Sequence, residues 1–288
     1  MNIHTTTRFL FFLLALWTIL PLTAQQSKQL YILQTSDTHS RIEPVSPHSS
    51  DPYAGLGGVA RRAAFVRQAR SEHPDLLLVD CGDISQGTPY YNMFGGELEV
   101  KAMNLMGYDA MTIGNHEFDN GLDNLARLIR LADFPVVCAN YDVTGTVLEG
   151  LVQPDVVIER DGLRIGLFGL GAELDGLVQS DKCEGVRFLD PVETARREVK
   201  RLREDEQCDV VVCLSHLGIS GDESDPVSDQ ALVRGTQGID LVLGGHSHTY
   251  MERPRYLMNA AGKSVPVMHV GKNGTYVGKI ILTLTPQD

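Results

Sequence analysis

The feature that most constrains the fold is a pattern in which short apolar runs, typical of buried strands, each end in a short polar motif. The apolar runs cover residues 30–33, 76–79, 110–113, 210–213 and 239–243. The motifs that follow them are, in chain order, Asp37-Thr38-His39, Gly82-Asp83, Gly114-Asn115-His116-Glu117, Ser215-His216 and Gly244-Gly245-His246-Ser247-His248. Because α/β folds place their ligands at strand ends, we expect these loops to meet in one site.

Segments with helical spacing alternate with the strands, at residues 59–71, 97–106, 120–131 and 191–206. This alternation predicts an α/β domain with buried sheets. Asp161-Gly162 lies between two runs of strand-forming residues and predicts a hairpin, so the sheets should be mixed. Residues 265–284 alternate around Gly274 and predict a terminal pair of strands.

Size and charge narrow the function. The chain has 288 residues, 43% of them hydrophobic, which is enough for one large domain or two small ones. A formal charge of −12 argues against binding of a nucleic-acid polymer. An anionic ligand must therefore be attracted locally, by cations or by a few basic side chains.

The N-terminus has the pattern of a secretory signal peptide. Arg8 is the only charged residue among the first 24, residues 9–20 form an apolar stretch, and Ala24 offers a small residue for cleavage. We predict a signal peptide at 1–24 and a mature domain at 25–288, exported to the periplasm or the extracellular space. An uncleaved anchor is the alternative.

The five cysteines do not resemble a zinc ribbon. Cys81, Cys138 and Cys213 lie within apolar runs and are expected to be buried thiols. Cys183 and Cys208 lie in polar segments, where they could form a disulfide in an oxidising compartment. The sequence leaves open whether they pair, because it does not set their geometry.

The polar motifs together carry the ligands for two divalent metal ions. Five of the nine histidines fall in the motifs, whereas His4, His48, His73 and His269 lie outside them and are given no functional role. The metal-competent side chains are Asp37, His39, Asp83, Asn115, His216, His246 and His248. Mixed nitrogen and oxygen ligands favour Zn, Mn, Fe or Co over a thiolate site.

The charge of such a site suits a phosphate ester. Two carboxylates against two divalent ions leave about +2, which attracts a phosphate dianion despite the acidic chain. Seven ligands also leave coordination positions open for water and substrate, unlike a closed structural site. Paired metals of this kind hydrolyse phosphate esters.

The order of the motifs resembles that of the calcineurin-like metallophosphoesterases, and their details resemble the 5′-nucleotidase and UDP-sugar hydrolase branch. The resemblance extends from about residue 30 to 284. It implies a four-layer α/β/β/α sandwich of two mixed sheets flanked by helices. Some members of the branch carry Gln at the position of His248, which bears on metal preference.

The resemblance also implies a role for each motif residue. Asp37, His39 and His248 would hold the first metal, and Asp83 would bridge the two. The second metal would be held by Asn115, His216 and His246. His116 would be catalytic and not a ligand, lying over the substrate phosphate and oriented by Asp119.

The function expected on this basis is hydrolysis of phosphate monoesters, with nucleotides as substrates, by a metal-bound hydroxide. One alternative is a cyclic-nucleotide or nucleotide-sugar phosphodiesterase, or a sulfur-ester hydrolase, on the same site. Another is a metal-bearing subunit that binds phosphate without turnover. Members of the branch carry a further nucleoside-binding domain, so a separate protein of that kind is an expected partner. No aromatic residue is assigned a stacking role.

Overall fold

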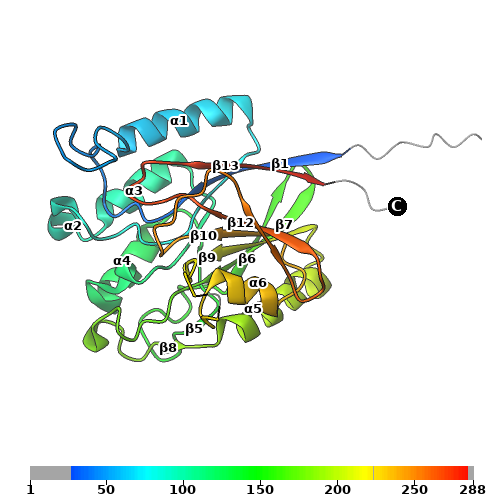
Figure 1. Ribbon diagram of the computed structural model, residues 1–288. Coiled ribbons are helices and arrows are strands. Elements are labelled where there is room, and N and C mark those ends of the chain that lie inside the picture. Colours follow the sequence, from blue (N-terminus) through cyan, green and yellow to red (C-terminus); the bar gives the residue numbers. More distant parts are fainter. Residues whose placement is uncertain (1–26, 223, 285–288) are drawn as a thin grey trace, which may run out of the picture.

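The computed structural model describes residues 27–222 and 224–284, and at its centre two mixed sheets lie face to face (Figure 1). The predicted signal peptide lies outside the described residues and stays a prediction. The first sheet has the strand order β13 (Gly278–Leu284), β1 (Lys28–Thr35), β2 (Leu77–Asp80), β3 (Ala110–Thr112) and β4 (Val136–Val137). Its strands β1 to β4 are parallel, and β13 pairs antiparallel with β1.

The second sheet has parallel strands in its middle and an antiparallel strand at each edge. Its order is β11 (Arg255–Met258), β12 (Ser264–His269), β10 (Leu241–Gly244), β9 (Val210–Ser215), β7 (Leu163–Leu170) and β6 (Asp155–Arg160). The β6–β7 hairpin turns at Asp161 and Gly162, as the sequence predicts. A separate ribbon joins β5 (Tyr141–Asp142) to β8 (Arg187–Phe188).

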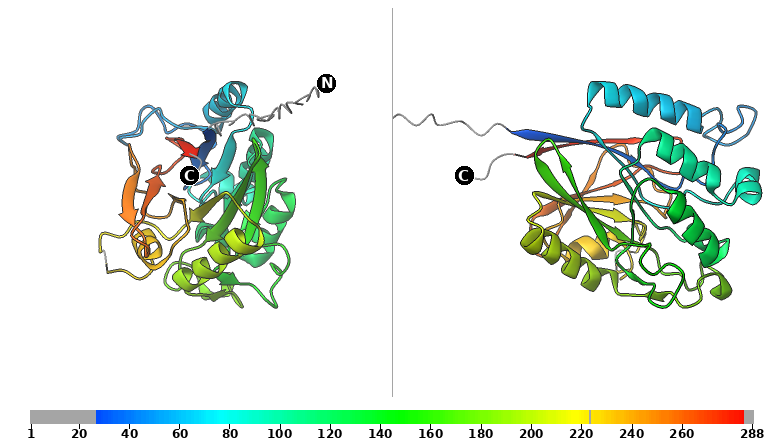
Figure 2. Two further views of the ribbon diagram at one scale, coloured as in Figure 1. Left: turned by 90° about the vertical axis from the view of Figure 1, so that its right-hand side faces the viewer. Right: turned by 180° about the vertical axis from the view of Figure 1, so that it is seen from behind.

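Helices cover the outer faces of both sheets, so the structure has four layers (Figure 1, Figure 2). The first sheet is covered by α1 (Val59–Glu72), α3 (Glu97–Met106) and α4 (Gly121–Leu131), and α2 (Pro89–Phe94) lies next to α3. The second is covered by α5 (Pro191–Lys200), η3 (Arg201–Asp205) and α6 (Asp229–Gly235). The short helices η1 (His116–Phe118) and η2 (Ser180–Lys182) lie in loops.

Three apolar cores fill the spaces between the layers. Leu78 and Met103 belong to the core under the first helical layer, and Ala195 and Val211 to the core under the second. Ile32 belongs to the core between the sheets, to which both sheets contribute side chains. The central strands are apolar on both faces because each face is covered, which is why they appear in the sequence as continuous apolar runs. The expected four-layer sandwich is confirmed.

One expectation from the sequence is wrong, and one question that the sequence left open is answered. The terminal segments on either side of Gly274 do not pair with each other, because β12 pairs with β10 and β11 while β13 crosses to β1 in the other sheet. Cys183 and Cys208 are both free. Cys183 packs against the core of the first helical layer and Cys208 belongs to that of the second, so two sheets separate them.

Local sequence explains where several helices begin. Asp190 caps α5 by accepting a hydrogen bond from the Glu193 amide at 2.8 Å, and Pro191 follows at the first helical position. Ser228 caps α6 through the Ala231 amide at 3.2 Å. Within the described ranges, no helix combines the length and apolar character that a membrane crossing requires.

The carboxyl ends of β1, β2, β3, β9 and β10 all bring their motifs to one edge of the sandwich. Backbone hydrogen bonds join neighbouring loops there, including Asp37 N to Gly82 O at 2.9 Å and Gly245 N to Ser215 O at 2.9 Å. The buried Gln34 joins the two sheets by donating to the carbonyl oxygens of Gly244 at 3.0 Å and Met268 at 3.2 Å. The strand-end loops of both sheets therefore share one site.

Candidate metal centre

Six of the expected ligands form two groups of three, in each of which the candidate ligand atoms all lie within 4.8 Å of one another. The first group is Asp37, His39 and His248, and the second is Asp83, His216 and His246. Each group combines one carboxylate with two imidazoles drawn from different loops. Asp37, His39 and His248 are thus near one another, as are His216 and His246, and Asp83 lies in the second group.

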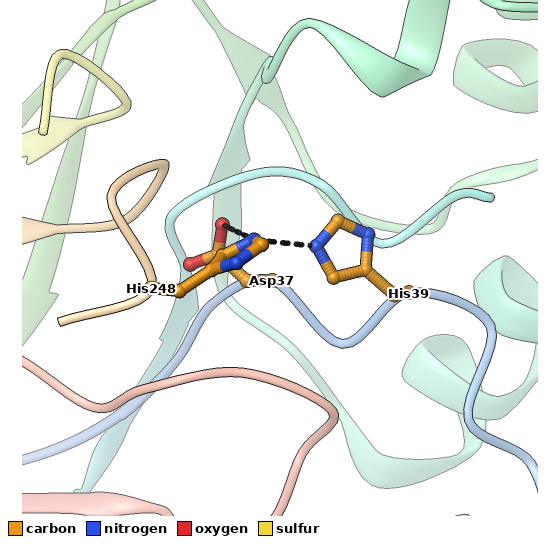
Figure 3. Close-up of side chains that lie close together, drawn as sticks. All are labelled: Asp37, His39 and His248. Carbon is orange, nitrogen blue, oxygen red and sulfur yellow. Dashed lines mark hydrogen bonds and ion pairs between the residues drawn. The ribbon is translucent and has the colours of Figure 1, made fainter. Parts of the chain in front are cut away.

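The first group lies between the ends of β1 and β10 (Figure 3). His39 Nε2 and His248 Nε2 face each other at 2.9 Å, and His248 Nε2 lies 3.7 Å from Asp37 Oδ1. Asp37 is fully buried, and its Oδ1 accepts a hydrogen bond from the His246 amide at 2.9 Å. The other oxygen, Oδ2, has no hydrogen-bond partner.

The second group is buried more deeply. His216 Nε2 lies 3.1 Å from Asp83 Oδ2, yet the two atoms are not in hydrogen-bonding geometry, as expected for two ligands of one cation. His216 Nδ1 faces the Cys81 carbonyl oxygen at 2.6 Å, which fixes the ring and leaves Nε2 as the ligand atom. Asn115 is also buried, and its Oδ1 has no hydrogen-bond partner.

These unpartnered atoms test whether the residues fit bound metals. Buried polar atoms are normally hydrogen-bonded, so each exception needs an explanation. Asp37 Oδ2, Asn115 Oδ1 and His216 Nε2 are all buried without a partner, and all three belong to the expected ligand set. Divalent cations would satisfy them, so the residues fit a two-metal site.

The protonation states also suit metal binding. Burial, followed by the charge of His216, lowers the pKa of His246 to about 4. Burial, followed by the charges of His39 and Lys272, lowers the pKa of His248 to about 4. Both rings are therefore neutral at pH 7, the form in which imidazole binds a metal.

In the second group, the pKa of His216 is shifted in the opposite direction, because His216 lies next to the Asp83 carboxylate. Burial lowers the pKa of His216, but the Asp83 carboxylate outweighs it and raises that pKa to about 10. Burial likewise raises the pKa of Asp83, yet the charge of the nearby His216 holds that pKa well below its usual value. The same negative potential attracts a cation to this position.

Glycines let the two groups lie side by side. A Cβ on Gly245 would lie 3.0 Å from Asp37 Oδ2 in the first group and 3.0 Å from His216 Nδ1 in the second. A Cβ on Gly114 would lie 2.2 Å from Asp83 Oδ1. Any side chain at either position would therefore displace candidate ligands.

His116 lies beside the first group without joining either. Its ring centroid is 5.4 Å from that of His39, and its Nδ1 faces Asp119 Oδ2 at 2.9 Å. The Asp119 hydrogen bond is the largest cause of a raised pKa for His116. The side chain is 31% exposed, so it is open to a ligand as well as oriented.

Comparison with known families identifies this arrangement. The profile of the calcineurin-like phosphoesterases matches residues 30–250. The chain belongs to the calcineurin-like phosphoesterase family. Its fold and its two groups of candidate ligands indicate a two-metal site.

Similar proteins include several 5′-nucleotidases. The chain is 34% identical over 277 residues to the snake venom 5′-nucleotidase of Crotalus adamanteus, covering 88% of this chain and 45% of that protein. It is 33% identical over 287 residues to the 5′-nucleotidase of Rattus norvegicus, covering 92% and 48%. A crystal structure of a 5′-nucleotidase precursor from Thermus thermophilus has a TM-score of 0.80 at 34% identity, covering 88% and 51%. The chain thus spans about half the length of these relatives.

In this calcineurin-like phosphoesterase, Glu117 supports the loops that carry the candidate ligands, a role that the sequence motifs did not reveal. The buried Glu117 carboxylate accepts amide hydrogen bonds from Asp83 at 2.8 Å, Gly114 at 2.7 Å and Ser85 at 3.1 Å. It therefore joins the loop of Asp83 to the loop of Asn115. An acidic residue next to His116 was a visible signal, but its partners depend on the tertiary fold.

A second buried network lies next to His216 and Gly244. Asp229 accepts a hydrogen bond from Ser215 Oγ at 2.5 Å through one oxygen, and its other oxygen lies 2.7 Å from His269 Nε2. A Cβ on Gly244 would collide with His269 Nε2 at 2.1 Å. The network connects the ends of β9 and β12 to the start of α6, and nothing in the local sequence links these residues.

Proposed function

We propose that this chain is an exported two-metal phosphoesterase that hydrolyses phosphate monoesters, with nucleotides as its substrate class. The observation that carries the proposal is a pair of adjacent groups of candidate metal ligands that contain buried atoms without hydrogen-bond partners. Next to them lies His116, which is oriented by Asp119 and belongs to neither group. The nucleotidase names of the relatives support the substrate class.

The proposed ligands follow the two groups. Asp37, His39 and His248 hold one ion, and His216, His246 and Asn115 hold the other. Asp83 serves both, since it lies in the second group and also acts electrostatically on His39. When bound, two divalent cations supply positive charge for the phosphoryl oxygens and make a water molecule more acidic.

His116 acts on the substrate. Asp119 holds Nδ1, so Nε2 remains available, with no hydrogen bond to any residue the structure describes. The raised pKa favours a proton on Nε2, which can donate to a phosphoryl oxygen or to the leaving-group oxygen. The buried side chains of both ligand groups lie in a low-dielectric interior, which strengthens these charge interactions.

Metal analysis and two substrates test the proposal. Purified protein should contain close to two transition-metal ions per chain, and Asp83→Asn should lower the content of both sites. It should hydrolyse p-nitrophenyl phosphate in preference to bis(p-nitrophenyl) phosphate. One ion or none in metal-replete buffer would contradict the two-metal site. A preference for the bis ester would indicate a phosphodiesterase, and two bound ions without turnover of either would indicate a binding subunit.

Export and partnership are proposals as well. Expression of the full chain should yield an exported form that begins near Gln25, as read by N-terminal sequencing. Retention of residues 1–24 would favour the uncleaved anchor. The separate nucleoside-binding protein expected from the resemblance stays a prediction, to be tested by co-purification.

A further inference from the structure

Three tyrosines that the proposed mechanism does not use form a cluster at the surface. The rings of Tyr250 and Tyr276 stack with centroids 4.2 Å apart and an interplanar angle of 29°. Tyr53 packs edge-on against Tyr276, with centroids 6.1 Å apart at 86°. Tyr250 is 47% exposed, and the other two are partly exposed. The cluster is thus a flat aromatic surface that is braced from within and open to solvent.

The backbone fixes this cluster to the first ligand group. Tyr250 follows His248 by two residues, which span at most about 7 Å of chain. The segment that leads to Tyr276 donates two backbone hydrogen bonds, from Gly271 N to Thr249 O at 2.9 Å and from Asn273 N to Asp37 O at 2.7 Å. The stack therefore keeps a fixed position relative to Asp37 and His248.

Two basic side chains lie on or next to the segment that leads to Tyr276. Lys272 lies between Gly271 and Asn273, the two residues that donate to Thr249 and Asp37, and it is partly exposed. Arg41 donates from Nε to Asn273 Oδ1 at 3.3 Å. In a chain with a net charge of −12, two cations at this rim favour an anion on the side of the site nearest the tyrosines.

We propose that the exposed side of the Tyr250–Tyr276 stack is a platform for the aromatic base of a nucleotide whose phosphate lies at the candidate metal centre. This inference rests on the proposed function and extends it by placing a base-binding subsite on this chain. Two stacked phenol rings already held in place lose little conformational freedom when a base packs on them. Binding energy from the base, remote from the reacting phosphate, then becomes available to raise kcat/KM.

The chemistry of the platform predicts between which substrates the enzyme discriminates. Every base has a π-face, so stacking without hydrogen-bond readout is tolerant of base identity. We expect AMP, GMP and UMP to have kcat/KM values within about tenfold of one another, because none gains a specific hydrogen bond from a ring face. Ribose 5-phosphate, which keeps the leaving group but lacks a base, should have a kcat/KM at least about tenfold lower than AMP.

The experiment compares AMP with ribose 5-phosphate in metal-loaded protein and its variants. Tyr250→Ala and Tyr276→Ala should bring the ratio of the two kcat/KM values to near one. Tyr250→Phe should keep the wild-type ratio, because the ring remains. Tyr250→Leu, which keeps apolar volume without a flat ring, should lose it. Tyr256→Ala is the matched control, since Tyr256 is 66% exposed on β11 outside the cluster, and it should keep the wild-type ratio.

The outcomes separate this inference from the proposed function. A wild-type ratio near one, or equal losses on both substrates in the alanine variants, would overturn the platform while leaving the phosphoesterase intact. Failure of the wild-type protein to hydrolyse either compound would instead count against the proposed function. Retention of the ratio in Tyr250→Leu would show that apolar bulk, and not stacking, is what matters.

Discussion

At the scale of single residues, His116 is set apart from the other site histidines by its contacts. Its Nδ1 is held by Asp119, its ring lies edge-on to His39, and it belongs to neither ligand group. The short helix η1 explains the pairing, since residues three apart share a helix face. These contacts support our proposal that His116 acts on the substrate and is not a metal ligand.

We therefore predict that His116→Ala lowers kcat by roughly 10²–10⁴-fold, the range for a positioned acid–base or electrostatic group. Metal content, measured by elemental analysis, should stay close to wild type. Asp119→Asn should show a smaller loss of the same kind, because it only orients the ring. His73→Ala, which removes a histidine stacked on Tyr31 away from the motifs, serves as the control. Loss of metal in His116→Ala would make His116 a ligand.

Glu117 gives a second prediction at this scale. Glu117→Gln replaces one oxygen, which accepts backbone hydrogen bonds, with an amide that can only donate. A buried donor would then face a backbone N–H, which costs roughly 2 kcal/mol of stability. Because the Asp83 and Asn115 loops lose their common anchor, metal affinity should fall as well. Thermal melts and metal titration measure both effects, with exposed Glu184→Gln as the control. Unchanged metal affinity would contradict the anchoring role.

At the scale of elements, the strand-end loops hold their ligands in an unusual backbone conformation. Asp37, His39, Asp83, His246 and His248 all have positive φ, between 46° and 68°. Non-glycine residues adopt this region at a cost, and they keep it only where surrounding structure imposes it. Hydrogen bonds to the backbone amides of these residues help to impose it here, including Asp83 N to Glu117, Asp37 N to Gly82 O and His246 N to Asp37 Oδ1.

The contact between β6 and α5 gives a pH-dependent prediction. Glu198 is 9% exposed, and Arg201 approaches it only to 3.9 Å while donating to Asp155 at 3.0 Å. Burial is the largest cause that raises the pKa of Glu198 from 4.5 to about 7. The hydrogen bond with Asp155 and the negative charge of Asp155 add to this increase. The folded state therefore binds this proton more tightly than the unfolded chain, and stability falls as pH rises between these values.

Glu198→Gln removes this titration, since the amide resembles the protonated acid. Relative to wild type, the variant should gain roughly 2 kcal/mol of unfolding free energy between pH 4.5 and pH 8. Urea denaturation at the two pH values measures the gain. The exposed Glu204→Gln provides the comparison, and it should show no such gain. A Glu198→Gln difference that does not change with pH would contradict the assignment.

At the scale of the whole molecule, the site joins the two sheets. The candidate ligands come from the ends of β1, β2 and β3 in one sheet and from the ends of β9 and β10 in the other. Ions that bind only the folded state stabilise it, by about 2.7 kcal/mol for one site at a hundredfold excess over Kd. Metal binding should therefore stabilise the whole sandwich.

Removal of metal with a chelator should accordingly lower the Tm by at least about 5 °C, given the usual 2–4 °C per kcal/mol for a domain of this size. Addition of a divalent transition metal should restore the Tm. The Asp37→Asn/Asp83→Asn double variant is the control, because it should show no further decrease with chelator. An equal decrease in this variant would mean that the chelator acts elsewhere.

Much of this protein could be predicted from the sequence because the information is local. The five polar motifs, their positions after apolar runs, and the seven metal-competent side chains are visible without any tertiary contact. Strand and helix periodicity predicted the α/β class for the same reason. The order of layers came from the family resemblance, since periodicity does not say which sheet a strand joins.

Long-range packing decided the rest. The segment after Gly274 joins β1, about 250 residues earlier in the chain, because β1 offers an apolar edge in the other sheet. The anchoring by Glu117, the Asp229–His269 pair and the Tyr250–Tyr276 stack each combine segments from different loops. The sequence by itself determined which chemical groups this protein has and the kind of element that carries each one. Only the tertiary structure decided which of them meet, because a contact across two sheets leaves no mark in the periodicity of either strand.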